Sequence, residues 1–133
     1  KAGGSAAPAS HATVDARHPY VYQEGRNVYK HAGTDMVESS KDIMKRNNLT
    51  VNDIDWFVPH QANLRIIEAV GGRIGIPEDK VLVNIQHYGN TSAASIPLCL
   101  DEYKNKLKKG DKVVLTAFGA GFTWGAMYIV WGI

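Results

Sequence analysis

The spacing of apolar and polar positions predicts helices that alternate with strands along most of the chain. Helical spacing of apolar residues predicts helices over residues 27–48 and 63–74, and a third over 91–108. Because Pro97 lies inside the third span, we expect either a kink there or a helix that starts nearer Ser95. Short apolar runs predict strands at residues 20–23, 55–58, 81–85, 112–118 and 123–131.

The order of these elements predicts an α/β fold. Helices that alternate with strands favour parallel pairing through right-handed crossovers. The short connection at 119–121 makes the last two strands antiparallel. Both of these strands are apolar on their two faces, which predicts helices on each side of the sheet. We therefore predict a layered mixed sheet with helices on both faces over residues 20–133, preceded by a linker at residues 1–19.

Composition narrows the class of protein. A chain of 133 residues with 44% hydrophobic and 21% charged residues is typical of one soluble globular domain. The net charge of +2 is too small to favour nucleic acid as a partner, and no apolar run is long enough to predict a membrane span. A single cysteine excludes an internal disulfide and favours a reducing, cytoplasmic location. The chain opens on Lys1 and not on Met, which suggests a fragment or a processed chain.

Candidate chemistry gathers after the predicted strands. Sites in open α/β sheets lie beyond the carboxyl ends of the strands, and His60, Asn90 and the glycine-rich turn at 119–121 each follow one. Taken singly, His60 and Asn90 are each more typical of a structural role: a histidine just after a buried strand is often structural, and Gly-Asn pairs are common in turns. The other histidines lack the spacing of metal ligands: His11, His18, His31 and His87.

Three strings of residues change this interpretation. They are VPHQANLR at 58–65, GNTSAAS at 89–95 and AFGAGFTWG at 117–125. Together they resemble the C-terminal half of β-ketoacyl-acyl-carrier-protein (ACP) synthase III, of the thiolase superfamily, from about Gly25 to the end of the chain. The resemblance implies one half of a thiolase-like fold, with residues 1–19 as a linker or a remnant of the connection between the halves. It also implies an enzyme that initiates fatty acid synthesis by decarboxylative Claisen condensation of an acyl-CoA primer with malonyl-ACP.

The resemblance assigns roles to four residues of the site. His60 and Asn90 match the histidine and asparagine that bind the malonyl thioester carbonyl. Two donors fixed at that oxygen would stabilise the charge that develops on decarboxylation. Phe118 matches a phenylalanine that lines the active site, and Ala120 matches a position whose backbone N–H helps to form an oxyanion hole. The family usually has glycine at this position, and alanine can keep the same role only if its φ is negative.

The resemblance also implies partners, and no metal or cofactor beyond the two substrates. Lys30, Arg65 and Arg73 match positions that dock ACP, while Tyr29 and Asn63 match positions near its pantetheine arm. Further implied partners are a CoA thioester, the N-terminal half of the same enzyme, and a second copy of the intact enzyme in a homodimer.

The nucleophile of this family lies in the N-terminal half. Cys99 belongs to an apolar helical stretch with no adjacent base, so we expect it to be structural and the chain alone to be inactive. Two alternatives stay open: another Cys-His-Asn synthase of the superfamily, of the polyketide type, and a non-catalytic interaction module with this fold. Asn90 in place of a second histidine disfavours the elongating synthases.

Overall fold

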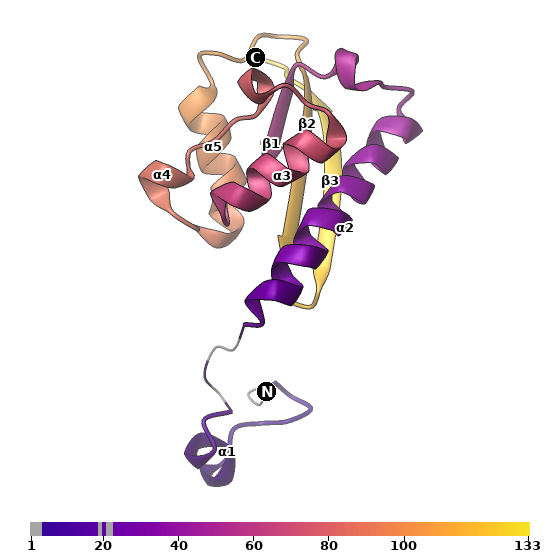
Figure 1. Cartoon of the computed structure of the whole chain (residues 1–133). Helices are drawn as coiled ribbons and strands as arrows, with labels where there is room; N and C mark the ends of the chain where they lie inside the picture. The colour runs from indigo at the N-terminus through magenta and orange to yellow at the C-terminus, as the bar shows by residue number, and fades with distance from the viewer. Residues whose placement is uncertain (1–3, 19, 21–22) are drawn as a thin grey trace.

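A three-stranded mixed sheet forms the centre of the computed structural model, which describes residues 4–18, 20 and 23–133. The sheet order is β1 (Trp56–Pro59), β2 (Lys112–Gly119) and β3 (Thr123–Val130). The longer helices are α2 (Gly25–Arg46), α3 (Leu64–Ile74) and α5 (Ser95–Tyr103). Figure 1 shows α2 and α3 across one face of the sheet and α5 on the other side. The predicted α/β fold with helices on both faces is confirmed.

Two apolar clusters, one on each face of β2, hold the layers together. Val114 and Phe118 point to the side of α2 and α3, where they pack with buried residues such as Met36 and Val70. Val113 points to the opposite side, where it packs with Cys99 of α5. This separation follows from the strand period of two residues, which sends neighbouring side chains to opposite faces.

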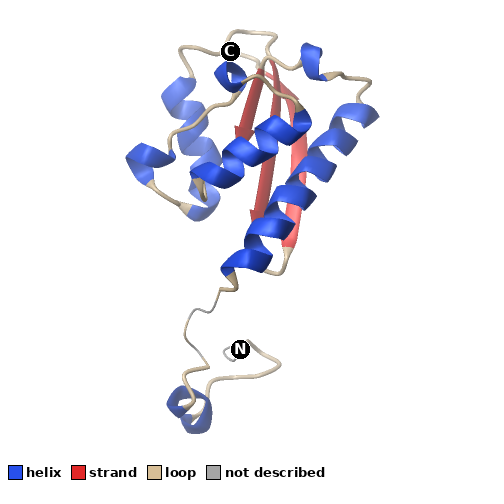
Figure 2. Cartoon of the chain, in the orientation of Figure 1, coloured by secondary structure: helices blue, strands red, loops and turns tan. Residues whose placement is uncertain are grey.

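Strand pairing follows the predicted directions. β1 runs parallel to β2, with Trp56 opposite Val113, and β2 runs antiparallel to β3, with Phe118 opposite Trp124. Figure 2 shows the three strands side by side between the helices. The carboxyl ends of β1 and β2 therefore lie at the same edge of the sheet.

Helix α3 begins and ends where the sequence predicts. The side chain of Asn63 accepts a hydrogen bond from the backbone N–H of Arg65 at 2.9 Å, which caps the first turn. Gly75 ends the helix with φ 92°, a left-handed conformation that glycine adopts at little cost. This helix fixes the direction in which the chain leaves the end of β1.

The predicted strand at 81–85 is wrong. Val81 forms an isolated parallel bridge with Phe57, and the N–H of Leu82 donates to the Phe57 carbonyl at 2.9 Å. The chain then leaves the sheet, because the Gln61 side-chain oxygen accepts the N–H groups of Asn84 and Ile85 at 2.9 and 3.2 Å. A short helix, α4 (Ile85–Tyr88), follows.

The third predicted helix is shorter than expected. A 3₁₀ turn (Ser92–Ala94) precedes α5, so the start nearer Ser95 is confirmed, whereas the end at 108 is wrong. Pro97 lies in the first turn, where a missing N–H removes no helical hydrogen bond. After Tyr103 the chain turns toward β2, and Asp111 Oδ2 accepts the backbone N–H of Lys108 at 2.8 Å.

Two differences concern the N-terminal residues. A short helix, α1 (His11–Asp15), was not predicted, and its signal is the capping box in which Ser10 and Thr13 each accept the other's backbone N–H. Figure 1 shows α1 apart from the layered body. The predicted strand at 20–23 includes residues 21 and 22, which lie outside the described residues.

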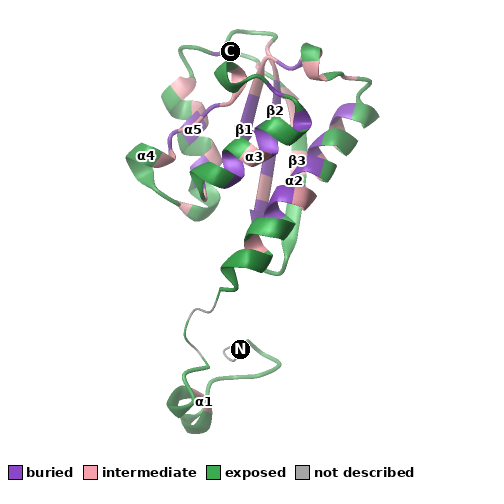
Figure 3. Ribbon diagram, in the orientation of Figure 1, coloured by how far each residue is buried: buried purple, intermediate pink, exposed green. Residues whose placement is uncertain are grey.

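The last strand is far more exposed than its apolar sequence predicts. Trp124, Met127 and Val130 are 54%, 58% and 56% exposed, and we call this surface the open β3 edge. Figure 3 shows β3 mostly exposed beside a largely buried β2. The sheet has helices on both faces, but β3 at its edge is incompletely covered: Tyr128 packs on the side of α2, and Ile129 is only partly buried on the other side.

Candidate active site

An open cavity of about 1410 Å³ lies at the carboxyl ends of β1 and β2. Its walls come from α2, from the chain after β1, from the segment between α4 and α5, and from β2, β3 and the turn that joins them. Four predicted site residues line it: His60, Asn90, Phe118 and Ala120. The fold therefore brings together side chains from three separate stretches of the sequence.

His60 is held at the end of the parallel strand pair. Its backbone N–H donates to the carbonyl of Thr116 at 2.8 Å, which extends the pairing of β1 and β2 by one residue. Its ring atom Nδ1 lies 2.5 Å from Ser95 Oγ. The side chain is half-buried, and this burial lowers the pKa of His60 below its ordinary value, which favours the neutral imidazole.

The lowered pKa of His60 predicts a pH-dependent stability. An unfolded chain would protonate His60 near its ordinary value of 6.5, while the folded protein would not. The unfolded state then binds more protons, so the free energy of unfolding is expected to fall as pH decreases below 6.5. Urea unfolding of the full-length protein across this range, compared with His60→Gln, measures the effect. Identical pH profiles for the two proteins would contradict it.

Asn90 has its amide orientation fixed by its own loop. Oδ1 accepts the backbone N–H of Ser92 at 2.9 Å, which leaves the amide nitrogen as the free donor end. The bond requires a sharply turned backbone, and Gly89 and Ser92 both adopt positive φ, at 66° and 53°. Asn90 is exposed to the cavity, so its N–H groups can reach a bound molecule.

Gln61 ties the end of β1 to the segment at 82–85, and sequence reasoning missed it. Its side-chain nitrogen donates to the carbonyls of Pro59 and Leu82 at 2.7 and 3.2 Å, while its oxygen accepts the N–H of Asn84 at 2.9 Å. Asn84 in turn donates to Glu102 Oε2 of α5 at 2.9 Å. A glutamine beside a motif histidine gives little signal in sequence, because its role depends on backbone groups that lie distant along the chain.

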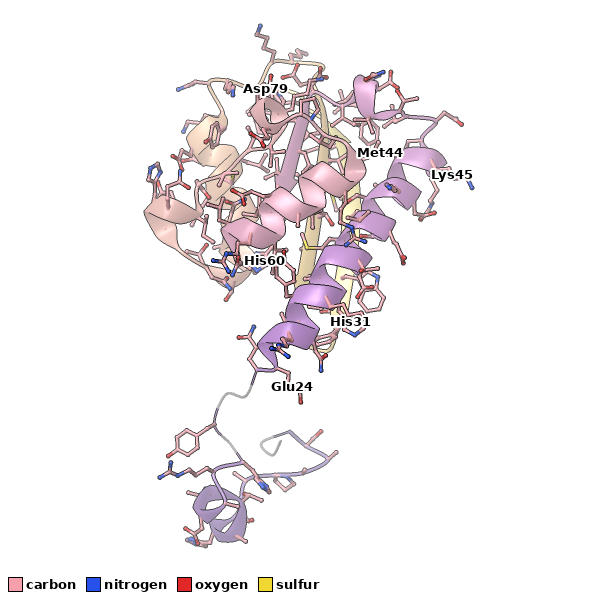
Figure 4. All side chains as sticks on the ribbon, viewed as in Figure 1. Glu24, His31, Met44, Lys45, His60 and Asp79 are labelled. Carbon is pink, nitrogen blue, oxygen red and sulfur yellow. The ribbon has the colours of Figure 1, made fainter. Side chains whose placement is uncertain are left out.

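Aromatic rings close one end of the cavity. The ring of Phe118 lies 5.0 Å from that of Phe122, and His31 of α2 lies 5.4 Å from Phe122, centroid to centroid. Figure 4 shows His31 on α2 and His60 near the start of α3. Ala120, in the same turn, is absent from the described non-glycine residues with positive φ, so it meets the condition that alanine requires there.

The five residues that the resemblance assigns to ACP docking and to the pantetheine arm do not line the cavity. Arg73 donates to the carbonyl of Gly33 at 2.6 Å and so links α3 to α2, and Asn63 caps α3. All five are exposed: Tyr29, Lys30, Asn63, Arg65 and Arg73.

Cys99 is completely buried, and burial together with the charge of Glu102 raises the pKa of its thiol to about 12. Such a thiol carries almost no thiolate at neutral pH. Within the part of the chain that the structure describes, no group of three or more His, Cys, Asp and Glu residues could hold a metal ion. Nor is any helix of the described residues long and apolar enough to cross a membrane.

Comparison with known proteins places these features in a family. Residues 44–131 match the family model described as 3-oxoacyl-[acyl-carrier-protein] synthase III C terminal. The chain is 65% identical over 131 residues to the β-ketoacyl-[acyl-carrier-protein] synthase III of Porphyromonas gingivalis, covering 98% of this chain and 39% of that protein. The chain thus spans about two-fifths of the length of that relative.

Solved structures agree with the sequence matches. The 3-oxoacyl-[acyl-carrier-protein] synthase III of Aquifex aeolicus has a TM-score of 0.82 at 42% identity, covering 84% of this chain and 37% of that one. The priming β-ketosynthase of the R1128 polyketide pathway has a TM-score of 0.77 at 35% identity, covering 84% of this chain and 34% of that one. The predicted resemblance is confirmed.

Proposed function

Because this chain belongs to the 3-oxoacyl-[acyl-carrier-protein] synthase III C-terminal family, we propose that it forms the C-terminal half of an enzyme that initiates fatty acid synthesis. The proposed substrates are an acyl-CoA primer and malonyl-ACP, with no further cofactor. A cysteine outside this sequence carries the acyl group. The malonyl carboxylate leaves as CO₂, its bonding electrons form an enolate, and the enolate carbon attacks the acyl carbonyl and expels the cysteine thiolate.

One observation carries this proposal: His60 and Asn90 line one cavity, and each has one polar atom held by the protein. The opposite polar atom of each side chain then remains for a ligand. Decarboxylation moves negative charge onto the thioester oxygen, and donors aimed at that position bind the transition state better than the ground state. Phe118 and the backbone N–H of Ala120 would complete the wall on the side of the acyl-cysteine.

Condensation itself tests the proposal. The full-length protein is expected to convert acetyl-CoA and malonyl-ACP to acetoacetyl-ACP with release of CO₂. The 133-residue chain alone is expected to form no acetoacetyl-ACP. The reason is that Cys99, the single cysteine of this chain, is buried and protonated. Product formation can be followed by mass spectrometry of the ACP. Turnover by the isolated chain would contradict the assignment of the nucleophile to another segment.

The exposed apolar surface supports a partner half. The open β3 edge and Leu98 of α5 expose large apolar side chains, of a kind that soluble proteins usually bury. We expect the N-terminal half of the same enzyme to cover them, and the intact enzyme to form a homodimer. Acidic ACP would dock near the exposed cations Lys30, Arg65 and Arg73, with Tyr29 and Asn63 near the pantetheine arm.

The similarity to a priming β-ketosynthase favours a second candidate, a polyketide-priming synthase with the same chemistry. The two candidates differ in the carrier protein and the primer that they accept. Relative condensation rates with fatty acid ACP and with polyketide ACP would separate them.

A further inference from the structure

Ser95 lies at the meeting point of the two donor segments. It is the first residue of α5 and is only 2% exposed. Its Oγ lies 2.5 Å from His60 Nδ1 and 3.3 Å from the backbone nitrogen of Gln61. A single buried hydroxyl therefore contacts both the site histidine and the residue that follows it.

The bonding capacity of a hydroxyl decides the direction of these contacts. Serine offers one proton and two acceptor lone pairs. The N–H of Gln61 can only donate, so it occupies a lone pair of Oγ. Among the hydrogen bonds of the described residues, His60 Nδ1 is then the one acceptor available for the Ser95 proton.

We infer that Ser95 is a positioning residue that donates its hydroxyl proton to His60 Nδ1 and so holds the imidazole in the Nε2–H tautomer. This inference rests on the proposed role of His60. With Nδ1 occupied, the N–H at Nε2 is the group that His60 presents to a ligand in the cavity. The opposite tautomer would present a lone pair to the developing oxyanion and would repel it.

The same short segment orients both donors. The N–H of Ser92 fixes Asn90 Oδ1, and the hydroxyl of Ser95 fixes His60 Nδ1. Cys99, one turn further along α5, is buried against β1 and β2 and anchors that helix. Residues 92–95 therefore orient both His60 and Asn90, although these two residues lie far apart in the sequence.

Removal of the hydroxyl tests the inference. In the full-length protein, Ser95→Ala is expected to slow malonyl decarboxylation about 10- to 100-fold, as when outer partners of metal-binding histidines are removed. Acylation of the nucleophilic cysteine should continue, and Ser95→Thr, which keeps the hydroxyl, should recover most of the rate. A Ser95→Ala enzyme that decarboxylates at the wild-type rate would overturn the inference.

Ser40→Ala is the matched control. Ser40 is also fully buried, but it does not itself line the cavity, and its hydroxyl donates to the Met36 carbonyl within α2 at 2.7 Å. It is expected to keep the wild-type rate. A loss equal to that of Ser95→Ala would mean that any buried serine deletion lowers the rate, and would overturn a specific role for Ser95.

The tautomer itself can be measured on the wild-type enzyme. ¹⁵N NMR of the histidine-labelled wild-type enzyme, with the His60 signals assigned by their loss in His60→Gln, is expected to show a protonated Nε2 and a bare Nδ1 at neutral pH. A protonated Nδ1 would overturn the inference. Full decarboxylation by His60→Ala would instead overturn the proposed function, whichever tautomer the spectrum shows.

Discussion

His60→Ala and Asn90→Ala, each in the full-length enzyme, are expected to slow malonyl decarboxylation by roughly 10²- to 10³-fold while the cysteine is still acylated by acyl-CoA. That range is typical for the loss of one donor to a developing oxyanion. The physical reason is that both side chains enter the cavity with one polar atom already occupied, His60 by Ser95 and Asn90 by Ser92. Release of ¹⁴CO₂ from labelled malonyl-ACP measures the first step, and mass spectrometry of the enzyme measures acylation.

Two exposed residues of the same types serve as controls. His11→Ala on α1 and Asn52→Ala in the 3₁₀ turn before β1 remove the same side chains away from the cavity and should leave both steps unchanged. If acylation and decarboxylation both disappear in the His60 and Asn90 variants, the two residues hold the structure together and the proposed donor role is wrong.

Gln61→Leu is expected to destabilise the full-length protein by about 3 kcal/mol or more. The substitution replaces the amide with an apolar side chain of similar size, so several buried backbone groups lose their hydrogen-bond partner, and each such loss costs about 1–3 kcal/mol. The groups affected are the carbonyls of Pro59 and Leu82 and the N–H groups of Asn84 and Ile85. The shift of the urea unfolding midpoint measures the loss.

Gln86→Leu is the control for this change. Gln86 is exposed and lies in the neighbouring helix α4, where its side-chain nitrogen donates weakly, at 3.4 Å, to the carbonyl of Val83. Its replacement is expected to change stability by about 0.5 kcal/mol at most, as for most surface positions. Equal destabilisation by the two substitutions would show that Gln61 is not the connection between the chain after β1 and the segment at 82–85.

Local sequence patterns were sufficient to predict the regular elements that carry the site. α3 was predicted correctly because its cap, apolar face and terminal glycine all lie within the helix or next to it. β2 and β3 were predicted because their apolar runs are long and flank a glycine-rich turn. Each of these signals depends on neighbouring residues, which a sequence displays directly.

The predictions failed where contacts with residues distant in the sequence determine the backbone conformation or the burial of a segment. The run at 81–85 has the composition of a strand, but Gln61 captures the N–H groups that would otherwise continue the sheet. β3 has the composition of a strand buried on both faces, yet much of its surface is open. Apolar composition predicts that a residue will be covered, and not which part of the molecule covers it.

Part of the cavity lining could be predicted from the sequence. His60, Asn90, Phe118 and Ala120 were identified from strings that resemble a known family, and all four line the cavity. Ser95 lies within one of these strings, but a serine at the start of a helix is usually interpreted as a cap. Its contact with His60 joins positions 35 residues apart and follows only from the packing of α5 against the end of β1.

The pairing of β1 with β2 has a consequence for the order in which the protein folds. β2 and β3 form a hairpin whose closure involves few residues, whereas the parallel pair brings Trp56 opposite Val113. Closing the longer loop costs more chain entropy, so we expect the hairpin to form early and the parallel pair late. The hydrogen bond from the backbone N–H of His60 to the carbonyl of Thr116 forms with the parallel pair, and so late. A folding intermediate that contains the hairpin would therefore still lack a positioned histidine, and decarboxylation would be among the last properties that the refolding protein acquires.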